Sequence, residues 1–362
     1  MDCSINKRTV GGRKSNIEAL RLLSMLMVLN LHGCWCFDTG SGWKQGLDFF
    51  REATSICAVD VFLIISGYFG IKWKFKSFFN LMFQLFFYSF GIYFVATCLG
   101  IIDFSMNGLA QCAKATYGSW GFISGYVVLY FVAPMINAFV GKIGKKKMLM
   151  YILVFYVAKV LICRDEDYFL YFLLYLIGRF LKKTEVVDKL KLNVSRSYWV
   201  LTILIFMASY SLYLFTGVNT ALKQSEFVIA LNYANPLIIL QAVFLFAVFS
   251  RLNFQNSIIN WLSSSCLAIF LIHMHPVIKD IGYYAYTKSL YTLPILEHVW
   301  ILLVIIICVF FGSILIDKVR IFLSDTFFDL INRIEYQSSF SFLEKCWGVL
   351  AQFYVKRMIK NE

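Results

Sequence analysis

Two ionisable residues of one apolar stretch are candidates for chemistry. Residues 20–33 read LRLLSMLMVLNLHG, in which Arg21 and His32 are separated by 11 positions. On an α-helix that separation turns about 1100°, roughly 20° past three full turns, so both side chains project from nearly the same face. Their axial separation is about 16 Å at 1.5 Å per residue. An imidazole accepts and returns protons near neutral pH, and a guanidinium binds anions such as phosphate. The spacing therefore makes Arg21 and His32 candidates for one shared site.

The alternative interpretation is that Arg21 and His32 have no role in chemistry. Arg21 lies only about one turn inside the apolar stretch, so its side chain can extend to the membrane surface. His32 can be an interfacial histidine with its hydrogen bonds satisfied. Glu18 lies three residues before Arg21 and can pair with it on the same helix face. The shared face favours the functional interpretation, because ionisable groups inside membrane helices usually face the bundle interior or a water-filled cavity.

The other three histidines, His273, His275 and His298, fall at or beside the predicted outer ends of apolar segments. One interpretation of these positions is a site at the outer face; the other is polar residues tolerated at helix ends, which best suits His298. His273 and His275 would point about 160° apart on a helix, so they do not converge on one ligand. We therefore predict no metal site.

Asp60 precedes a Ser66-Gly67 pair in the segment VDVFLIISGYFG. Its carboxylate is a candidate to orient His32, as carboxylates orient catalytic imidazoles; the alternative is an interfacial carboxylate in water. Gly67 is expected to allow close helix packing.

Three lysines follow that segment: Lys72, Lys74 and Lys76. They are candidates for attracting phosphates, although lysines that only set membrane topology look the same.

The composition predicts an all-α, polytopic membrane protein. Hydrophobic residues make up 60% of the chain and charged residues only 15%, with a mean hydropathy of +0.70. A soluble domain carries more charge. The net charge of +13 does not indicate nucleic acid, because the positive residues fall in short segments between apolar runs.

We predict about ten transmembrane helices, because a span needs about 20 mostly apolar residues. They are residues 17–37, 53–71, 77–101, 120–140, 147–163, 168–181, 198–217, 227–250, 257–277 and 298–317. Lysine and arginine concentrate in alternate connecting segments, which predicts that both termini are cytoplasmic. The expected organisation is a basic cytoplasmic N-terminus (1–16), a transmembrane domain (17–322) and a cytoplasmic amphipathic tail (323–362).

Taken in order, several segments resemble the acyltransferase 3 family, membrane acyltransferases that modify bacterial surface glycans. RKSNIEALRLLSMLMVLNLH resembles the family's first span, with Arg21 and His32 at the positions of its arginine and histidine. VDVFLIISGYF resembles its second span, and SWGFISGYVVLYFVAPMIN, YFLLYLIGRFL and LSSSCLAIFLIHMHPVI resemble later ones. The resemblance covers residues 15 to about 320. Lysines replace the arginines that often follow the family's second span, and Leu63 replaces a phenylalanine.

The resemblance implies transfer of an acyl group, expected to be acetyl, from acetyl-CoA as co-substrate, with no cofactor. The acceptor would be a sugar hydroxyl of a cell-surface or lipid-linked glycan, and the location a bacterial inner membrane. Arg21 and the lysines would hold the donor, and His32 would act as general base or acyl carrier. Trp120 and His273 would lie on the acceptor side.

The rival class is an exporter or flippase of a polysaccharide or its precursor. Aromatic residues, 18% of the chain, suit sugar binding in such a protein as well. Against it, the sequence shows no inverted repeat and no pair of Gly/Pro-broken spans, which are the usual signs of a transporter.

Overall fold

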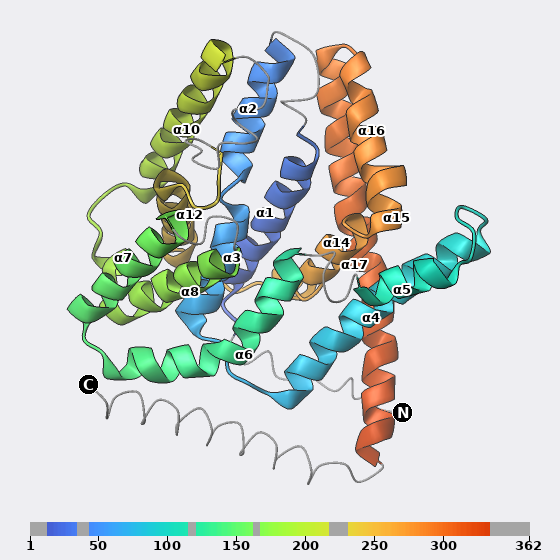
Figure 1. The fold of residues 1–362 in the computed structure, drawn as a ribbon, viewed down its shortest axis with the longest axis horizontal. Helices are drawn as coiled ribbons and strands as arrows, with labels where there is room; N and C mark the ends of the chain where they lie inside the picture. The colour runs from blue at the N-terminus through green and yellow to red at the C-terminus, as the bar shows by residue number, and fades with distance from the viewer. Residues whose placement is uncertain (1–12, 35–42, 115–120, 162–166, 217–230, 334–362) are drawn as a thin grey trace.

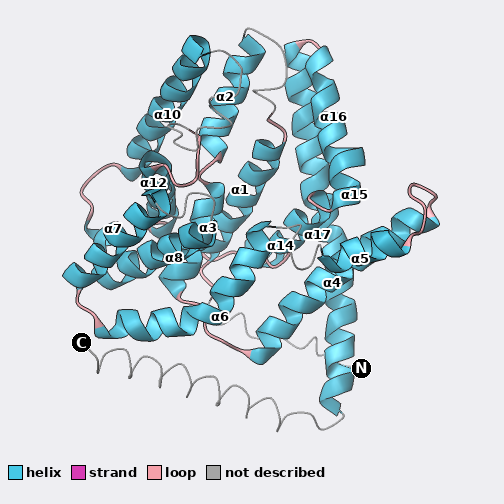
Figure 2. Ribbon diagram, in the orientation of Figure 1, coloured by secondary structure: helices cyan, strands magenta, loops and turns pink. Residues whose placement is uncertain are grey.

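The protein is a bundle of α-helices, as the sequence predicts. The computed structural model describes residues 13–34, 43–114, 121–161, 167–216 and 231–333, and these ranges contain no β-strand (Figure 2). The principal helices are α1 (Ser15–His32), α2 (Trp43–Ser55), α3 (Ala58–Phe69), α4 (Phe75–Cys98), α5 (Met106–Lys114), α6 (Gly121–Lys142), α7 (Lys145–Leu161), α8 (Asp167–Thr184), α9 (Val186–Lys189), α10 (Val194–Thr216), α12 (Pro236–Ser250), α13 (Ser257–Ser263), α14 (Cys266–His273), α15 (Pro276–Ile278), α16 (Tyr284–Ser289) and α17 (Ile295–Arg333).

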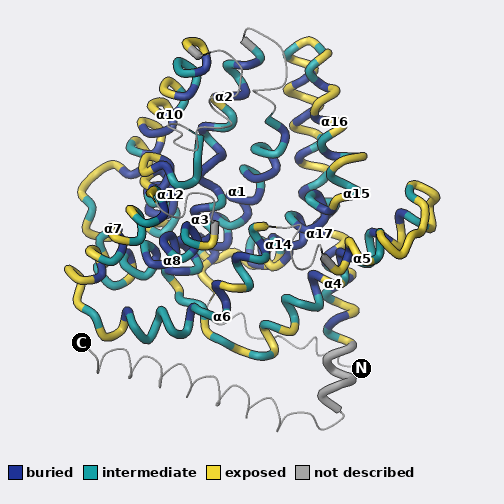
Figure 3. The backbone as a smooth tube through the Cα atoms, viewed as in Figure 1, coloured by how far each residue is buried: buried dark blue, intermediate teal, exposed yellow. Residues whose placement is uncertain are grey.

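The helix α1 lies in the middle of the bundle (Figure 1). It contacts α2, α3, α12, α13, α14 and α17. Its apolar side chains Leu20 and Leu29 have no exposed surface, and Figure 3 shows most of the helix buried or half-buried. Because other helices pack around α1, its polar residues can face the interior of the bundle.

Two glycines allow α3 and α8 to touch backbone to backbone. A Cβ on Gly67 would lie 2.2 Å from the carbonyl oxygen of Tyr175, and a Cβ on Gly178 would lie 2.3 Å from the carbonyl oxygen of Ile64. The expectation that Gly67 serves close packing is confirmed. This contact fixes α3, which forms one wall of the cavity described below.

The segment after α13 is a broken helix. The pair Ser257–His273 and Pro276–Thr292 is bent by 66°, and a π-helix (Lys279–Tyr283) follows the break. Pro276 begins the second half, since proline fits the first turn of a helix but cannot continue one. His275 accepts a hydrogen bond from the Val277 amide through Nδ1 at 3.3 Å, and its Nε2 lies 3.0 Å from the Ser89 carbonyl oxygen. The break is thereby tied to α4.

The apolar helices indicate a multi-pass membrane protein, but ten spans and the side on which the termini lie are not confirmed. Four helices within the described ranges are long and apolar enough to cross a membrane: Phe75–Cys98, Gly121–Lys142, Val194–Phe215 and Ile295–Thr326. The bent pair gives a fifth if it is one span. Several other predicted spans form short helices, of 12 residues in α3 and 15 in α12, fewer than the roughly 20 that a span needs.

Some segments predicted as loops are helical. The region before residue 53 contains α2, and the region after residue 101 contains α5, which together with α4 projects from the bundle (Figure 1). The predicted boundary between residues 322 and 323 falls inside α17, which continues to Arg333. Residues 1–12 and 334–362 of the predicted terminal regions lie outside the described ranges.

Candidate active site

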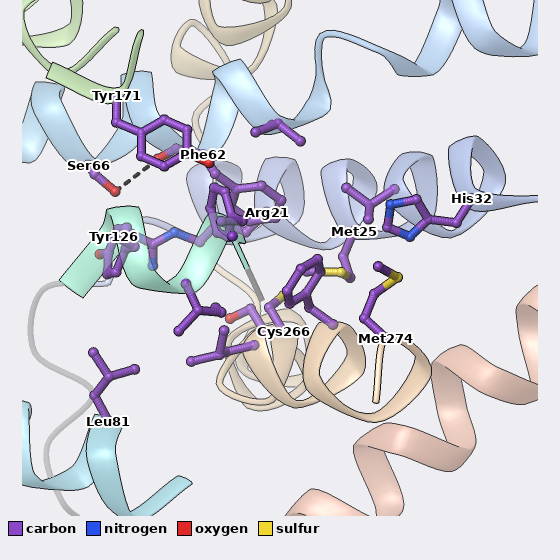
Figure 4. A pocket seen from close by; sticks show the side chains of 18 of the residues that line it. Arg21, Met25, His32, Phe62, Ser66, Leu81, Tyr126, Tyr171, Cys266 and Met274 are labelled. Atoms are coloured by element: carbon purple, nitrogen blue, oxygen red, sulfur yellow. Dashed lines mark hydrogen bonds between the residues drawn. The ribbon is translucent and has the colours of Figure 1, made fainter. Parts of the chain in front are cut away.

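One cavity runs along the face of α1 that carries both predicted residues. It has a volume of about 530 Å³, and its lining includes Arg21 and His32. Figure 4 shows the two side chains on the same helix with Met25 between them. The helical spacing predicted this shared face, and the structure shows that the face borders a hollow space rather than a packed core.

The middle of the cavity is mainly apolar. Met25 and Val28 of α1, Phe62 of α3, Phe122 of α6 and Phe270 of α14 line it. Such walls accept a flexible and largely uncharged chain, since polar groups without partners are disfavoured there. The cavity therefore offers an apolar passage between two polar ends.

Charged residues gather at the Arg21 end. The Arg21 guanidinium donates to a Glu18 carboxylate oxygen at 3.0 Å, and the side chain of Glu18 is only 8% exposed whereas that of Arg21 is 36% exposed. Arg13 also lines the cavity and donates to the Asn260 carbonyl oxygen at 3.4 Å. A guanidinium has five N–H donors, so Arg21 can bind an anion while Glu18 orients it. Arg13 was not predicted, because one arginine in a basic N-terminal run carries no distinguishing signal.

The His32 end holds a pair of histidines. The Nδ1 atom of His32 lies 2.9 Å from the Nε2 atom of His273. The Nδ1 atom of His273 lies 2.6 Å from the Ile269 carbonyl oxygen. His273 has no exposed surface, and the rings of Phe270 and Tyr284 lie 6.5 and 6.4 Å from the His32 ring. The predicted acceptor-side residue is therefore in direct contact with the predicted base.

A polar clamp that the sequence did not reveal fixes the end of α1 beside His32. Arg51 of α2 donates through Nε to the Asn30 side-chain oxygen at 3.0 Å and through a terminal nitrogen to the Asn30 carbonyl oxygen at 3.3 Å. Asp48 holds Arg51 at 2.7 Å, and Tyr291 donates to Asp48. The sequence signals were Asn30 inside an apolar run and the i,i+3 spacing of Asp48 and Arg51, in a stretch predicted as a loop.

Asp60 is fully buried in α3. Neither of its carboxylate oxygens has a hydrogen-bond partner among the described residues, and the nitrogen that His32 presents to the protein meets His273 instead. Asp60 is also not part of the cavity lining. The structure does not bring Asp60 and His32 together through a hydrogen bond, so a role for Asp60 in orienting His32 remains a prediction from the sequence.

The three lysines lie outside the cavity. Lys72, Lys74 and Lys76 are exposed where α3 connects to α4, and they are not among the lining residues. Their predicted role in binding the donor stays a prediction, with Arg13 and Arg21 as the cations that the structure places at the cavity itself. Trp120 lies outside the described residues. Within the described ranges, no group of three or more His, Cys, Asp or Glu side chains is placed to hold a metal ion.

The comparison with protein families decides between the classes that the site allows. The model of the acyltransferase 3 family, described as an acyltransferase domain, matches residues 14–318. The chain belongs to this family. No curated protein and no solved structure gives a match. The matched range begins directly after Arg13 and ends in α17, so every residue that lines the cavity except Arg13 lies inside the acyltransferase domain.

Proposed function

We propose that the protein is an integral membrane O-acyltransferase. It moves an acyl group, expected to be acetyl, from a cytoplasmic acyl-CoA to a sugar hydroxyl of a cell-surface or lipid-linked glycan. The proposed location is the inner membrane of a bacterium. The observation that carries the proposal is that one cavity has Arg21 at one end and His32 at the other, in a chain that belongs to an acyltransferase family.

Three parts of an acyl-CoA donor, namely its phosphates, its pantetheine arm and its thioester, suit three regions of the cavity. Arg21 and Arg13, which line the same cavity, would bind the phosphates, and Lys72, Lys74 and Lys76 would attract them from outside the cavity. The pantetheine arm would lie along the apolar middle. The separation of about 16 Å along α1 would then bring the thioester to His32.

At His32 the reaction is acyl transfer from sulfur to oxygen. The imidazole takes the proton of the acceptor hydroxyl while the hydroxyl oxygen attacks the thioester carbonyl. The carbon–sulfur bond breaks, and the leaving thiolate takes the proton back from the imidazolium. The products are the glycan ester and free CoA. The alternative, in which His32 first carries the acyl group, uses the same ring and the same cavity.

The exporter or flippase is not favoured, because the match is to an acyltransferase domain. Loss of an acyltransferase removes the ester from the glycan, whereas loss of an exporter lowers the amount of glycan at the surface. Cells with the intact protein, with His32→Ala and with no gene would be compared for ester content and for total amount of surface glycan. We expect His32→Ala to remove the ester and to leave the glycan and the membrane level of the protein unchanged. Normal ester content in the variant would overturn the proposal, and a fall in total glycan with an unchanged ester fraction would restore the exporter.

A further inference from the structure

We infer that His273 is a positioning residue that fixes the proton of His32 on Nδ1, so that Nε2 is the atom that accepts the proton of the acceptor hydroxyl. This inference rests on the proposed acyl transfer and assigns one atom and one new role within it. It is carried by two contacts in series: His32 Nδ1 to His273 Nε2 at 2.9 Å and His273 Nδ1 to the Ile269 carbonyl oxygen at 2.6 Å.

The proton on His273 follows from its shorter contact. A backbone carbonyl oxygen has lone pairs and no hydrogen, so it can only accept. A nitrogen 2.6 Å from the Ile269 oxygen must therefore carry the hydrogen, which places it on Nδ1 of His273. The contact is made at the end of α14, which terminates at His273.

The charge of His273 follows from its surroundings. The side chain has no exposed surface, and its two nitrogens contact a histidine and a carbonyl oxygen, neither of which is negative. Burying an unpaired charge is far more costly than burying a neutral imidazole. His273 is therefore neutral, and its Nε2 is a bare acceptor.

The tautomer of His32 then has one solution. Two nitrogens 2.9 Å apart share one hydrogen. Because Nε2 of His273 is the acceptor, Nδ1 of His32 is the donor. A neutral His32 has its lone pair on Nε2, and this is the nitrogen that can act as a base. If the hydrogen lay on Nε2 instead, the ring could not take a proton from a hydroxyl at that atom.

The same geometry argues against a direct contact between His273 and an acceptor sugar. A residue that binds substrate needs accessible surface, and His273 has none. His273 contacts His32 as the orienting residue contacts the catalytic histidine in other enzymes. Such a residue holds the imidazole in position and stabilises it once it is protonated. Here the partner is a neutral histidine fixed by a backbone carbonyl, where many enzymes use a carboxylate.

The functional test compares three variants of the full-length protein in membranes or detergent. His273→Leu removes the acceptor for the His32 N–H, whereas His273→Gln retains a side-chain oxygen that can accept it. His275→Asn is the matched control: it replaces the neighbouring buried histidine and keeps a residue type that caps the N-terminus of α15. We expect kcat to fall by about 10²-fold or more in His273→Leu, with KM for acetyl-CoA within a few-fold of the natural protein. His273→Gln should recover about tenfold of that loss, and His275→Asn should keep near-natural kcat.

A spectroscopic measurement keeps the test independent of how the variants fold. The chain has four histidines, so ¹⁵N resonances of labelled imidazoles can be assigned by single substitutions. In the natural protein we expect His32 to have a protonated Nδ1 and a bare Nε2. A protonated Nε2 on resting neutral His32 would overturn the inference, as would natural kcat in a folded His273→Leu. Full ester formation by His32→Ala would instead overturn the proposed function.

Discussion

Gly67 of α3 packs so closely on α8 that an added Cβ would lie 2.2 Å from the carbonyl oxygen of Tyr175. The obstructing atom belongs to the backbone and cannot turn aside as a side chain can. We predict that Gly67→Ala forces the helices apart and lowers stability by about 3 kcal/mol or more. Thermal unfolding in detergent checks this. Gly91→Ala in α4 is the control, because a Cβ there meets nothing within 4 Å, and it should raise stability by up to about 1 kcal/mol. Equal effects of the two changes would contradict the argument.

We expect replacement of Arg21 and replacement of the three lysines to affect donor binding differently. Arg21 lines the cavity and is oriented by Glu18, so Arg21→Gln should raise KM for acyl-CoA about tenfold to a hundredfold, the worth of a charged hydrogen bond. The triple change of Lys72, Lys74 and Lys76 to Gln removes exposed charges. Its effect should be smaller and should vanish at high salt, because exposed charges act at a distance and are screened.

Both variants would be measured by initial rates over a range of donor concentrations, at low and high ionic strength. A larger, salt-resistant effect of the lysine change would show that the donor binds outside the cavity. That result would restore the lysines as the main donor-binding residues.

Asn30 joins the end of α1 to α2 through Arg51, at a distance of 3.0 Å between the Arg51 Nε and the Asn30 side-chain oxygen. Asn30→Ala leaves the half-buried guanidinium without this acceptor, so we expect a loss of about 1–3 kcal/mol in stability. The kcat should fall as well, because His32 lies two residues further on. Asn107→Ala removes an exposed asparagine of α5 and should change stability by less than about 0.5 kcal/mol. An Asn30 variant as stable and active as this control would show that the clamp does not position His32.

The helical class and the shared face of Arg21 and His32 were predictable, because composition and the 3.6-residue period act locally. The partner of His32 was not, since His273 lies 241 positions away and only tertiary packing selects it among the histidines. The break between α2 and α3 was also missed, because residues 53–71 are mostly apolar and were predicted as one span. The helix α2 was missed because Asp48 and Arg51 look solvent-exposed in sequence, whereas in the fold they neutralise each other in the interior.

Replacing Asp60 tests whether its carboxylate takes part in catalysis. It is fully buried, and its oxygens have no hydrogen-bond partner among the described residues. Asp60→Asn keeps the shape and removes any charge, so stability should stay equal or rise, since an isolated buried charge is costly. His32 keeps its contact with His273 in this variant, and kcat should therefore stay within a few-fold of the natural value. Initial rates and thermal unfolding on the same preparation decide the question. A hundredfold loss of kcat at unchanged stability would show that the carboxylate acts in catalysis, as the sequence alone suggested.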